Sequence, residues 1–140
     1  FVSFFHDLLL KEDQLASIHN KLQLYEAKLP EKDKELVLNH ANKMATMVQG
    51  LSHVPAGVDV IIRQHHGVSN GVGFADGPNS ALSPPAIAFI VLESFATMVL
   101  SFRPKEQKFA DLIQKLYEDY SIPSFRKVVD ALKDTLTKNI

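Results

Sequence analysis

The sequence "PEKDKELVLNHANKMATMVQG" (residues 30–50) decides the fold class, because it carries a complete set of helix signals. Pro30 stands at the first turn with acidic residues directly after it, and Gly50 is a stop signal. Three apolar side chains and a histidine recur at spacings of three or four residues, which places them on one face of a helix: Leu36, His40, Met44 and Met47. We therefore predict a helix with a histidine on its apolar face.

Similar patterns lie on both sides of this segment. We predict a helix end over residues 1–10, partly helical structure over 11–29, and further helices over 55–66, from Pro84-Pro85 to 102, over 104–120 and over 123–138. Glycine is frequent in the segment 67–83, which predicts a loop. No convincing alternation of apolar and polar residues predicts a strand, so the fold class is all-α.

Length and composition limit the classes of function that the chain can have. The chain has 140 residues, 46% of them hydrophobic, which predicts a single domain over 1–140 with its own core. The net charge of −1 gives no indication of a DNA partner, and the absence of cysteine excludes disulfides and thiolate metal sites. A cytoplasmic location is expected, because nothing in the composition requires an oxidising compartment. Residues 1–10 start in mid-pattern, so we expect the domain's N-terminal helices to lie outside this chain.

The most apolar stretch is "AIAFIVLESFATMVLSF" (residues 86–102). It is shorter than the roughly 18 to 20 residues that span a bilayer, and Glu93 near its middle would be costly in lipid. We predict a buried helix and no membrane span. Buried in this way, Glu93 requires a partner of opposite charge or a cation.

Histidines and acids are the candidate functional residues. Four of the six histidines and two acids are embedded in apolar helices: His6, Asp7, His40, His65, His66 and Glu93. Unpaired burial of such groups costs several kcal/mol, and a shared metal site would satisfy all of them. His19 and His53 lie in weakly patterned segments and are not expected to be ligands. In the alternative, the histidines only fill the core of a structural bundle, but Glu93 would then lack a counter-charge.

The chemistry of these side chains suits divalent ions. Imidazole and carboxylate groups bind iron, manganese and zinc. Adjacent residues on a helix point about 100° apart, so His6 and Asp7, or His65 and His66, can address two different ions. The two oxygens of Asp7 can span a metal pair. Two ions about 3.5 to 4 Å apart clamp and activate a bridging hydroxide for attack on a phosphate ester.

A set of short motifs, in order along the chain, resembles a known family. These are "FFHD" (4–7), "LPEKDKELVLNH" (29–40), "HHGVSNGVGFA" (65–75), "VLESFATM" (91–98) and "FRP" (102–104). Their order and spacing resemble those of HD-domain metal-dependent phosphohydrolases, specifically a divergent HD-GYP-type cyclic di-GMP phosphodiesterase. The resemblance covers roughly residues 2–110.

The resemblance implies a helical bundle of HD-domain type that hydrolyses cyclic di-GMP, a bacterial second messenger, through a metal-bridging hydroxide. It implies two divalent metal ions, iron or manganese, with Asp7 as the bridging catalytic residue. The implied ligands are His6, Asp7, His40, His65, His66 and Glu93. Arg103 and Lys108 would contact the substrate phosphates, and the glycine-rich loop would turn beside the nucleotide.

Several positions depart from the family pattern. The family's phosphate-contacting lysine falls on Leu10, its tyrosine on Phe74, and a second basic residue on Glu106. Gly67 and Asn70 stand where the family has acidic residues. These losses leave a second function open, a catalytically degenerate HD-type domain that acts as a nucleotide sensor or protein-interaction module. An additional N-terminal domain or a homodimer is also left open.

Overall fold

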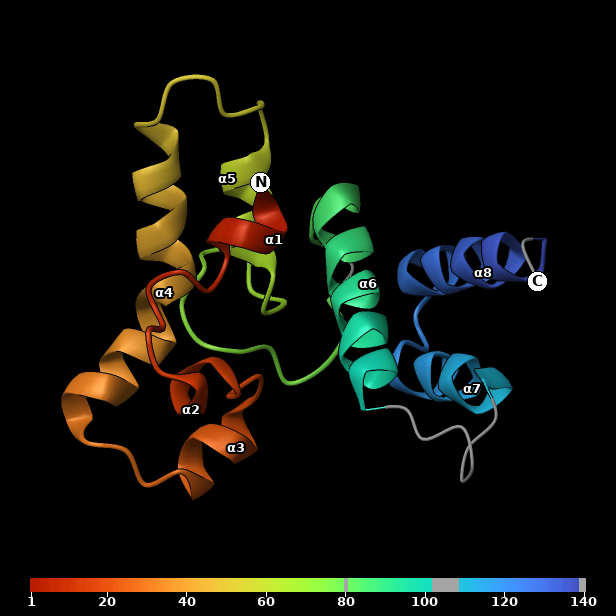
Figure 1. The fold of residues 1–140 in the computed structure, drawn as a ribbon, viewed down its shortest axis with the longest axis horizontal. Helices are drawn as coiled ribbons and strands as arrows, with labels where there is room; N and C mark the ends of the chain where they lie inside the picture. The colour runs from red at the N-terminus through yellow and green to blue at the C-terminus, as the bar shows by residue number, and fades with distance from the viewer. Residues whose placement is uncertain (80, 102–108, 139–140) are drawn as a thin grey trace.

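The computed structural model describes residues 1–79, 81–101 and 109–138, and within these ranges the chain is helical without strands (Figure 1). The all-α prediction is therefore confirmed for this part of the chain. The helices are α1 (Val2–Phe5), α2 (Asp13–Ala16), α3 (Lys21–Glu26), α4 (Glu31–Gln49), α5 (Val58–Gln64), α6 (Pro84–Leu100), α7 (Phe109–Asp119) and α8 (Pro123–Thr137).

Helix α4 confirms the helix predicted over 30–50, with Pro30 as its N-cap and Gly50 as its C-cap. The predicted apolar face is correct at His40 and Met44, which are buried, but wrong at Met47, which is 55% exposed. Val48 is buried instead. Spacings of three and of four both keep a residue near one face, but among the buried residues of α4 Val48 lies near the middle of the stripe, whereas Met47 lies at its edge.

Three clusters of buried apolar side chains form the core. One joins α4, α5 and α1 and includes Met44 and Ile62, and a second joins α2, α3 and the first half of α4. The third cluster joins α6 to α7 and α8 around Val91, Leu116 and Phe125. Helix α4 packs against α5, and α6 packs against α5, α7 and α8 (Figure 1). Helix α6 thus links the two halves of the fold.

Helix α5 is shorter than predicted. The helix expected over 55–66 begins at Val58, because Gly57 takes a left-handed conformation with φ of 87°, and it ends at Gln64. His65 is the C-cap and His66 follows in a turn, so both histidines leave the end of the helix. The two rings lie close together there, with their centroids 3.8 Å apart.

Helix α6 confirms the apolar helix predicted after Pro84-Pro85, but the prediction that it is buried is wrong for much of its length, because Leu92, Val99 and Leu100 are exposed. It buries Ala86, Ile87 and Val91 against its neighbours. Of the helices in the described ranges, none combines the length and the apolar character that crossing a bilayer requires. The helices predicted over 104–120 and 123–138 are present as α7 and α8, but residues 102–108 lie outside the described part of the chain.

The glycine-rich loop after α5 is bonded to the middle of α4. The Asn42 N–H donates to the Gly71 carbonyl over 3.1 Å, and the Gly73 N–H donates to the Leu38 carbonyl over 2.7 Å. Leu38 and Asn42 are one helical turn apart and flank His40. Figure 1 shows that α4 changes direction near its middle. Contacts that engage the helical ladder are a known cause of such bends.

Gly71 is required for this contact. Its φ is 72°, and a Cβ atom at this position would lie 2.8 Å from the Arg63 Cγ and 3.0 Å from the Asn42 backbone nitrogen. The glycine at 71 thus permits a close approach of backbone to backbone. In the structure this glycine seats the loop on α4. The turn beside a nucleotide, which the resemblance implies for this loop, stays a prediction.

Candidate metal centre

All six predicted ligands lie together in the structure. They come from the end of α1 (His6 and Asp7), the middle of α4 (His40), the end of α5 (His65 and His66) and the middle of α6 (Glu93). Their ligand atoms form two groups, each with all atoms within 4.8 Å of one another. The four-residue group is Asp7, His40, His65 and His66, and the three-residue group is His6, Asp7 and Glu93.

Asp7 belongs to both groups and uses a different oxygen for each. Its Oδ1 lies 3.1 Å from the His40 Nε2 and 3.4 Å from the His65 Nε2. Its Oδ2 lies 3.4 Å from the His6 Nε2. The carboxylate therefore has the position expected of a bridge between two cations.

Helix carbonyls orient three of the imidazole rings. The Nδ1 atoms of His40 and His65 each lie 2.6 Å from a carbonyl three residues earlier, of Val37 and Ile62. The His6 Nδ1 lies 3.2 Å from the Val2 carbonyl. Because a carbonyl only accepts, each Nδ1–H donates to it, and the Nε2 atoms of His40 and His65 are left to face the centre. This is the arrangement that fixes histidine ligands in metal sites.

Acceptors crowd together at the middle of the four-residue group. The His40 Nε2 lies 3.4 Å from the His65 Nε2 and 3.1 Å from the His66 Nε2. The buried Oδ1 of Asp7 has no hydrogen-bond partner of regular geometry among the described residues. Either shared protons or a cation must lie between these atoms, because lone pairs facing one another at such distances repel. The donor set of three imidazoles and a carboxylate fits a divalent transition metal.

The electrostatics favour the protonation states of metal ligands. Burial alone would raise the pKa of Asp7, but His40 and His65 more than offset it and hold the pKa well below its usual range. Burial lowers the pKa of His66, and the neighbouring His65 and His40 lower it further. Asp7 is thus an anion and His66 a neutral ring near neutral pH. Metal ligands of these types bind in those forms.

Glu93 has the partner that its position in an apolar helix requires. The His6 Nε2 lies 2.7 Å from the Glu93 Oε1. Burial tends to lower the pKa of His6, but Glu93 and Asp7 outweigh it and raise the pKa. The structure thus gives Glu93 a hydrogen-bonding partner, the His6 ring, which carries the opposite charge when it is protonated.

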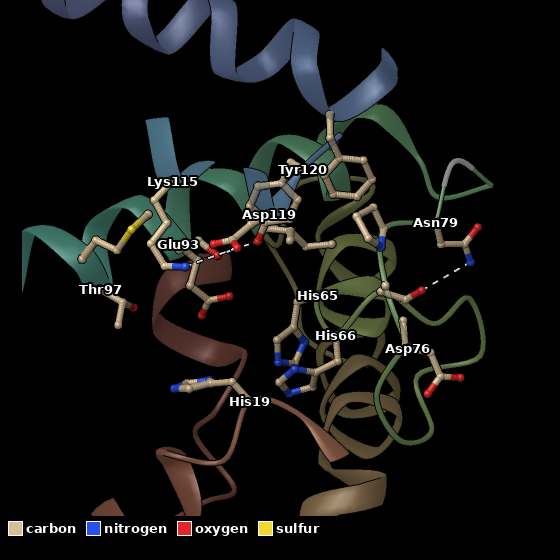
Figure 2. A pocket seen from close by; sticks show the side chains of 18 residues that line it. His19, His65, His66, Asp76, Asn79, Glu93, Thr97, Lys115, Asp119 and Tyr120 are labelled. Atoms are coloured by element: carbon tan, nitrogen blue, oxygen red, sulfur yellow. Dashed lines mark hydrogen bonds and ion pairs between the residues drawn. The ribbon is translucent and has the colours of Figure 1, made fainter. Parts of the chain in front are cut away.

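A cavity of about 450 Å³ lies beside the centre, and Figure 2 shows its lining. His65, His66 and Glu93 form the side nearest the centre. His19 comes from the connection between α2 and α3, whereas Lys115 comes from α7. A volume of this size is typical of small-molecule sites.

The predicted substrate contacts Arg103 and Lys108 lie outside the described residues. The structure instead places Lys115 on the cavity wall, with its Nζ 3.4 Å from the Asp119 Oδ1. The sequence did not single out this lysine, because it is one of several charges on the polar side of an amphipathic helix. His19 belongs to neither ligand group, as expected, but it lines the cavity.

Two departures from the family pattern have a packing explanation. Phe74 is 3% exposed, and its ring meets the His66 ring at a centroid distance of 4.5 Å. The hydroxyl of a tyrosine would be buried in this position. Leu10 is 7% exposed and belongs to the core cluster of α2, α3 and α4. A lysine there would have to leave the core to reach a phosphate.

Comparison with known proteins gives no relative, since no protein-family model, no curated protein and no solved structure matches this chain. The resemblance to HD-GYP proteins therefore rests on the motif residues and their spacing.

Metal addition should stabilise the folded chain. We expect Mn²⁺ at about 100 times its dissociation constant to add about 2.7 kcal/mol of stability relative to the chain in EDTA, a rise of roughly 10 °C in Tm. Differential scanning calorimetry would measure the shift. The control is Asp7→Asn, which keeps the side-chain shape and weakens the shared ligand. An equal rise in the control, or no rise in the unaltered chain, would contradict specific binding at this centre.

Proposed function

We propose that the chain is a metal-dependent phosphodiesterase of HD-GYP type that hydrolyses cyclic di-GMP. The observation that carries the proposal is the position of Asp7, whose two oxygens face two separate sets of ligands. A shared carboxylate of this kind is suited to holding two cations side by side. The proposal includes the HD-type helical bundle, iron or manganese as the pair of ions, and a cytoplasmic setting.

In the proposed reaction, each ligand residue of the chain would have a separate role. Two metal ions, when bound, supply Lewis acids and an activated water for attack on phosphorus. Asp7 would fix the separation of the two positions. The carbonyls of Val37 and Ile62 hold the rings of His40 and His65, so that Nε2 needs no reorientation to bind. His6 and Glu93 would complete the three-residue group.

The cavity supports a substrate of nucleotide size. It opens beside both ligand groups, because Glu93 of the three-residue group and His65 and His66 of the four-residue group all line it. A phosphodiester placed there would lie against the centre, while Lys115, which also lines the cavity, would provide a cation for a second phosphate in exchange for its ion pair with Asp119 (Figure 2). Two phosphates at separate positions are the feature that distinguishes a cyclic dinucleotide from a mononucleotide.

A cleavage assay tests the proposal. The purified chain, loaded with Mn²⁺ or Fe²⁺ under anaerobic conditions, should convert cyclic di-GMP to the linear dinucleotide or to GMP, as followed by chromatography. EDTA and Asp7→Asn should each reduce the rate by at least about 100-fold, because both remove the centre. Hydrolysis that persists in both would contradict the metal mechanism.

A second function is favoured by two observations. Leu10 and Phe74 are buried in the core, so the positions of the family's lysine and tyrosine offer no polar group to a substrate. We propose as the alternative a catalytically degenerate sensor or protein-interaction module that keeps the fold. Calorimetric binding of cyclic di-GMP without turnover, in the metal-loaded chain, would select the sensor.

A further inference from the structure

His19 lines the cavity, and neither the motif pattern nor the ligand groups assign it a role. Figure 2 shows its side chain in the same opening as His65, His66 and Glu93, on a wall contributed by the connection between α2 and α3. It is exposed to solvent, and its ring has no hydrogen-bond partner among the residues that the structure describes. The ring is therefore available to a molecule bound in the cavity.

The backbone around His19 is held in place. The His19 N–H donates to the Gln23 Oε1 over 2.7 Å, and the Gln23 N–H donates in return to the Asn20 Oδ1 over 3.0 Å. These reciprocal bonds form a capping arrangement at the start of α3. The Lys21 Nζ also lies 2.6 Å from the Asp76 Oδ1, which links this connection to the loop on the adjacent cavity wall. An exposed residue with a fixed backbone is well suited to contact a ligand.

Two other proton donors in the cavity wall, Lys115 and Tyr120, are already engaged. The Lys115 ammonium lies beside the Asp119 carboxylate, at 3.4 Å. The Tyr120 hydroxyl shares a hydrogen bond of 2.6 Å with Ser94, and burial raises the pKa of Tyr120 although this bond opposes the rise. Imidazole, in contrast, can donate a proton near neutral pH. Of the described cavity residues outside the metal centre, His19 is the one that presents an imidazole.

We propose that His19 donates a proton to the leaving oxygen of a phosphodiester whose leaving group is a sugar alkoxide. This assignment rests on the proposed phosphodiesterase function. The oxygen of water forms a bond to phosphorus, and the bond from phosphorus to the ester oxygen breaks. The ester oxygen keeps the electron pair and takes the proton of the His19 imidazolium. The proton released by the attacking water passes to solvent, from which the neutral imidazole of His19 is protonated again.

The test compares two leaving groups in one variant. A sugar alkoxide needs protonation to leave, whereas p-nitrophenolate leaves as a stable anion. We therefore expect His19→Asn to lower kcat for cyclic di-GMP by about 100-fold or more, and to change the rate for bis(p-nitrophenyl) phosphate by less than about threefold. The metal content of the variant should equal that of the unaltered chain. The matched control is His53→Asn, at an exposed histidine in the connection between α4 and α5 whose φ of 69° suits asparagine.

Each outcome separates this assignment from the function on which it rests. Suppose that the unaltered chain cleaves both compounds. If His19→Asn then cleaves both at unchanged rates, or if its rates for both fall by the same factor, the proton-donor role is overturned while the phosphodiesterase function stands. If the chain cleaves the aryl ester alone, the role is overturned as well, because no alkoxide leaves. If it holds no metal and cleaves neither compound, the proposed function is contradicted, and the role of His19 is overturned with it. Selective loss on cyclic di-GMP, absent in His53→Asn, supports the assignment.

Discussion

Asp7→Ala is expected to remove nearly all divalent metal from the purified chain, from about two ions per molecule to well below one. The reason is that Asp7 is the residue shared by the two ligand groups, with Oδ1 facing His40 and His65 and Oδ2 facing His6. Its loss takes one ligand from each position at once and leaves the buried imidazoles without the negative charge that balances a cation. Inductively coupled plasma mass spectrometry of the untagged protein would measure the content.

Two further variants test whether metal is lost because Asp7 is shared by the two ligand groups. Glu93→Gln changes the three-residue group alone and should leave about one ion per chain, because the four-residue group keeps all its ligands. Asp76→Ala changes an exposed carboxylate paired with Lys21 and should leave the content unchanged. Unaltered metal in Asp7→Ala would refute the bridge. Equal losses in Glu93→Gln and Asp7→Ala would show one interdependent site in place of two.

Gly71→Ala is expected to destabilise the fold by about 2 to 5 kcal/mol. The left-handed backbone at 71 contributes about 1 to 2 kcal/mol of this for any residue with a Cβ atom. The remainder comes from the contacts of that atom with Arg63 and with the Asn42 backbone, which can be relieved only by moving the loop away from α4. Chemical denaturation, followed by circular dichroism, would measure the change.

The chain provides controls that separate the two causes. Gly57 also has a positive φ, of 87°, but a Cβ atom there would have nothing within 4 Å, so Gly57→Ala should show the backbone cost alone. Gly77 has neither a positive φ nor a neighbour within 4 Å, so Gly77→Ala should be close to neutral. If Gly71→Ala is no more destabilising than Gly57→Ala, the loop is not seated on α4 as described.

Helix type and the main helix boundaries could be predicted from sequence because the deciding signals are local. Prolines at residues 30, 84 and 123 stand at or next to helix starts in the structure, as predicted. The late start and the early end of α5 were not predicted, because the left-handed turn at Gly57 and the turn after Gln64 depend on packing that a periodic pattern does not show. Met47 was misplaced for a similar reason, since spacing alone does not say where a buried stripe ends.

The convergence of the six ligands was predicted through the order of motifs, and the need of Glu93 for a partner followed from its apolar surroundings. The cavity wall was not predictable in the same way. His19 and Lys115 lie almost a hundred residues apart and meet at the cavity only through the packing of separate helices. The role of Gly71 was also hidden, because its neighbours Asn42 and Arg63 are brought to it by tertiary contacts.

The division of ligands around Asp7 makes the two positions chemically unequal. One offers three ring nitrogens and one oxygen, and the other offers a single nitrogen and two carboxylates. Softer cations prefer nitrogen-rich surroundings and harder cations prefer oxygen-rich ones. A chain supplied with two kinds of metal would therefore sort them between the positions, giving a mixed pair that anomalous diffraction at each absorption edge would distinguish.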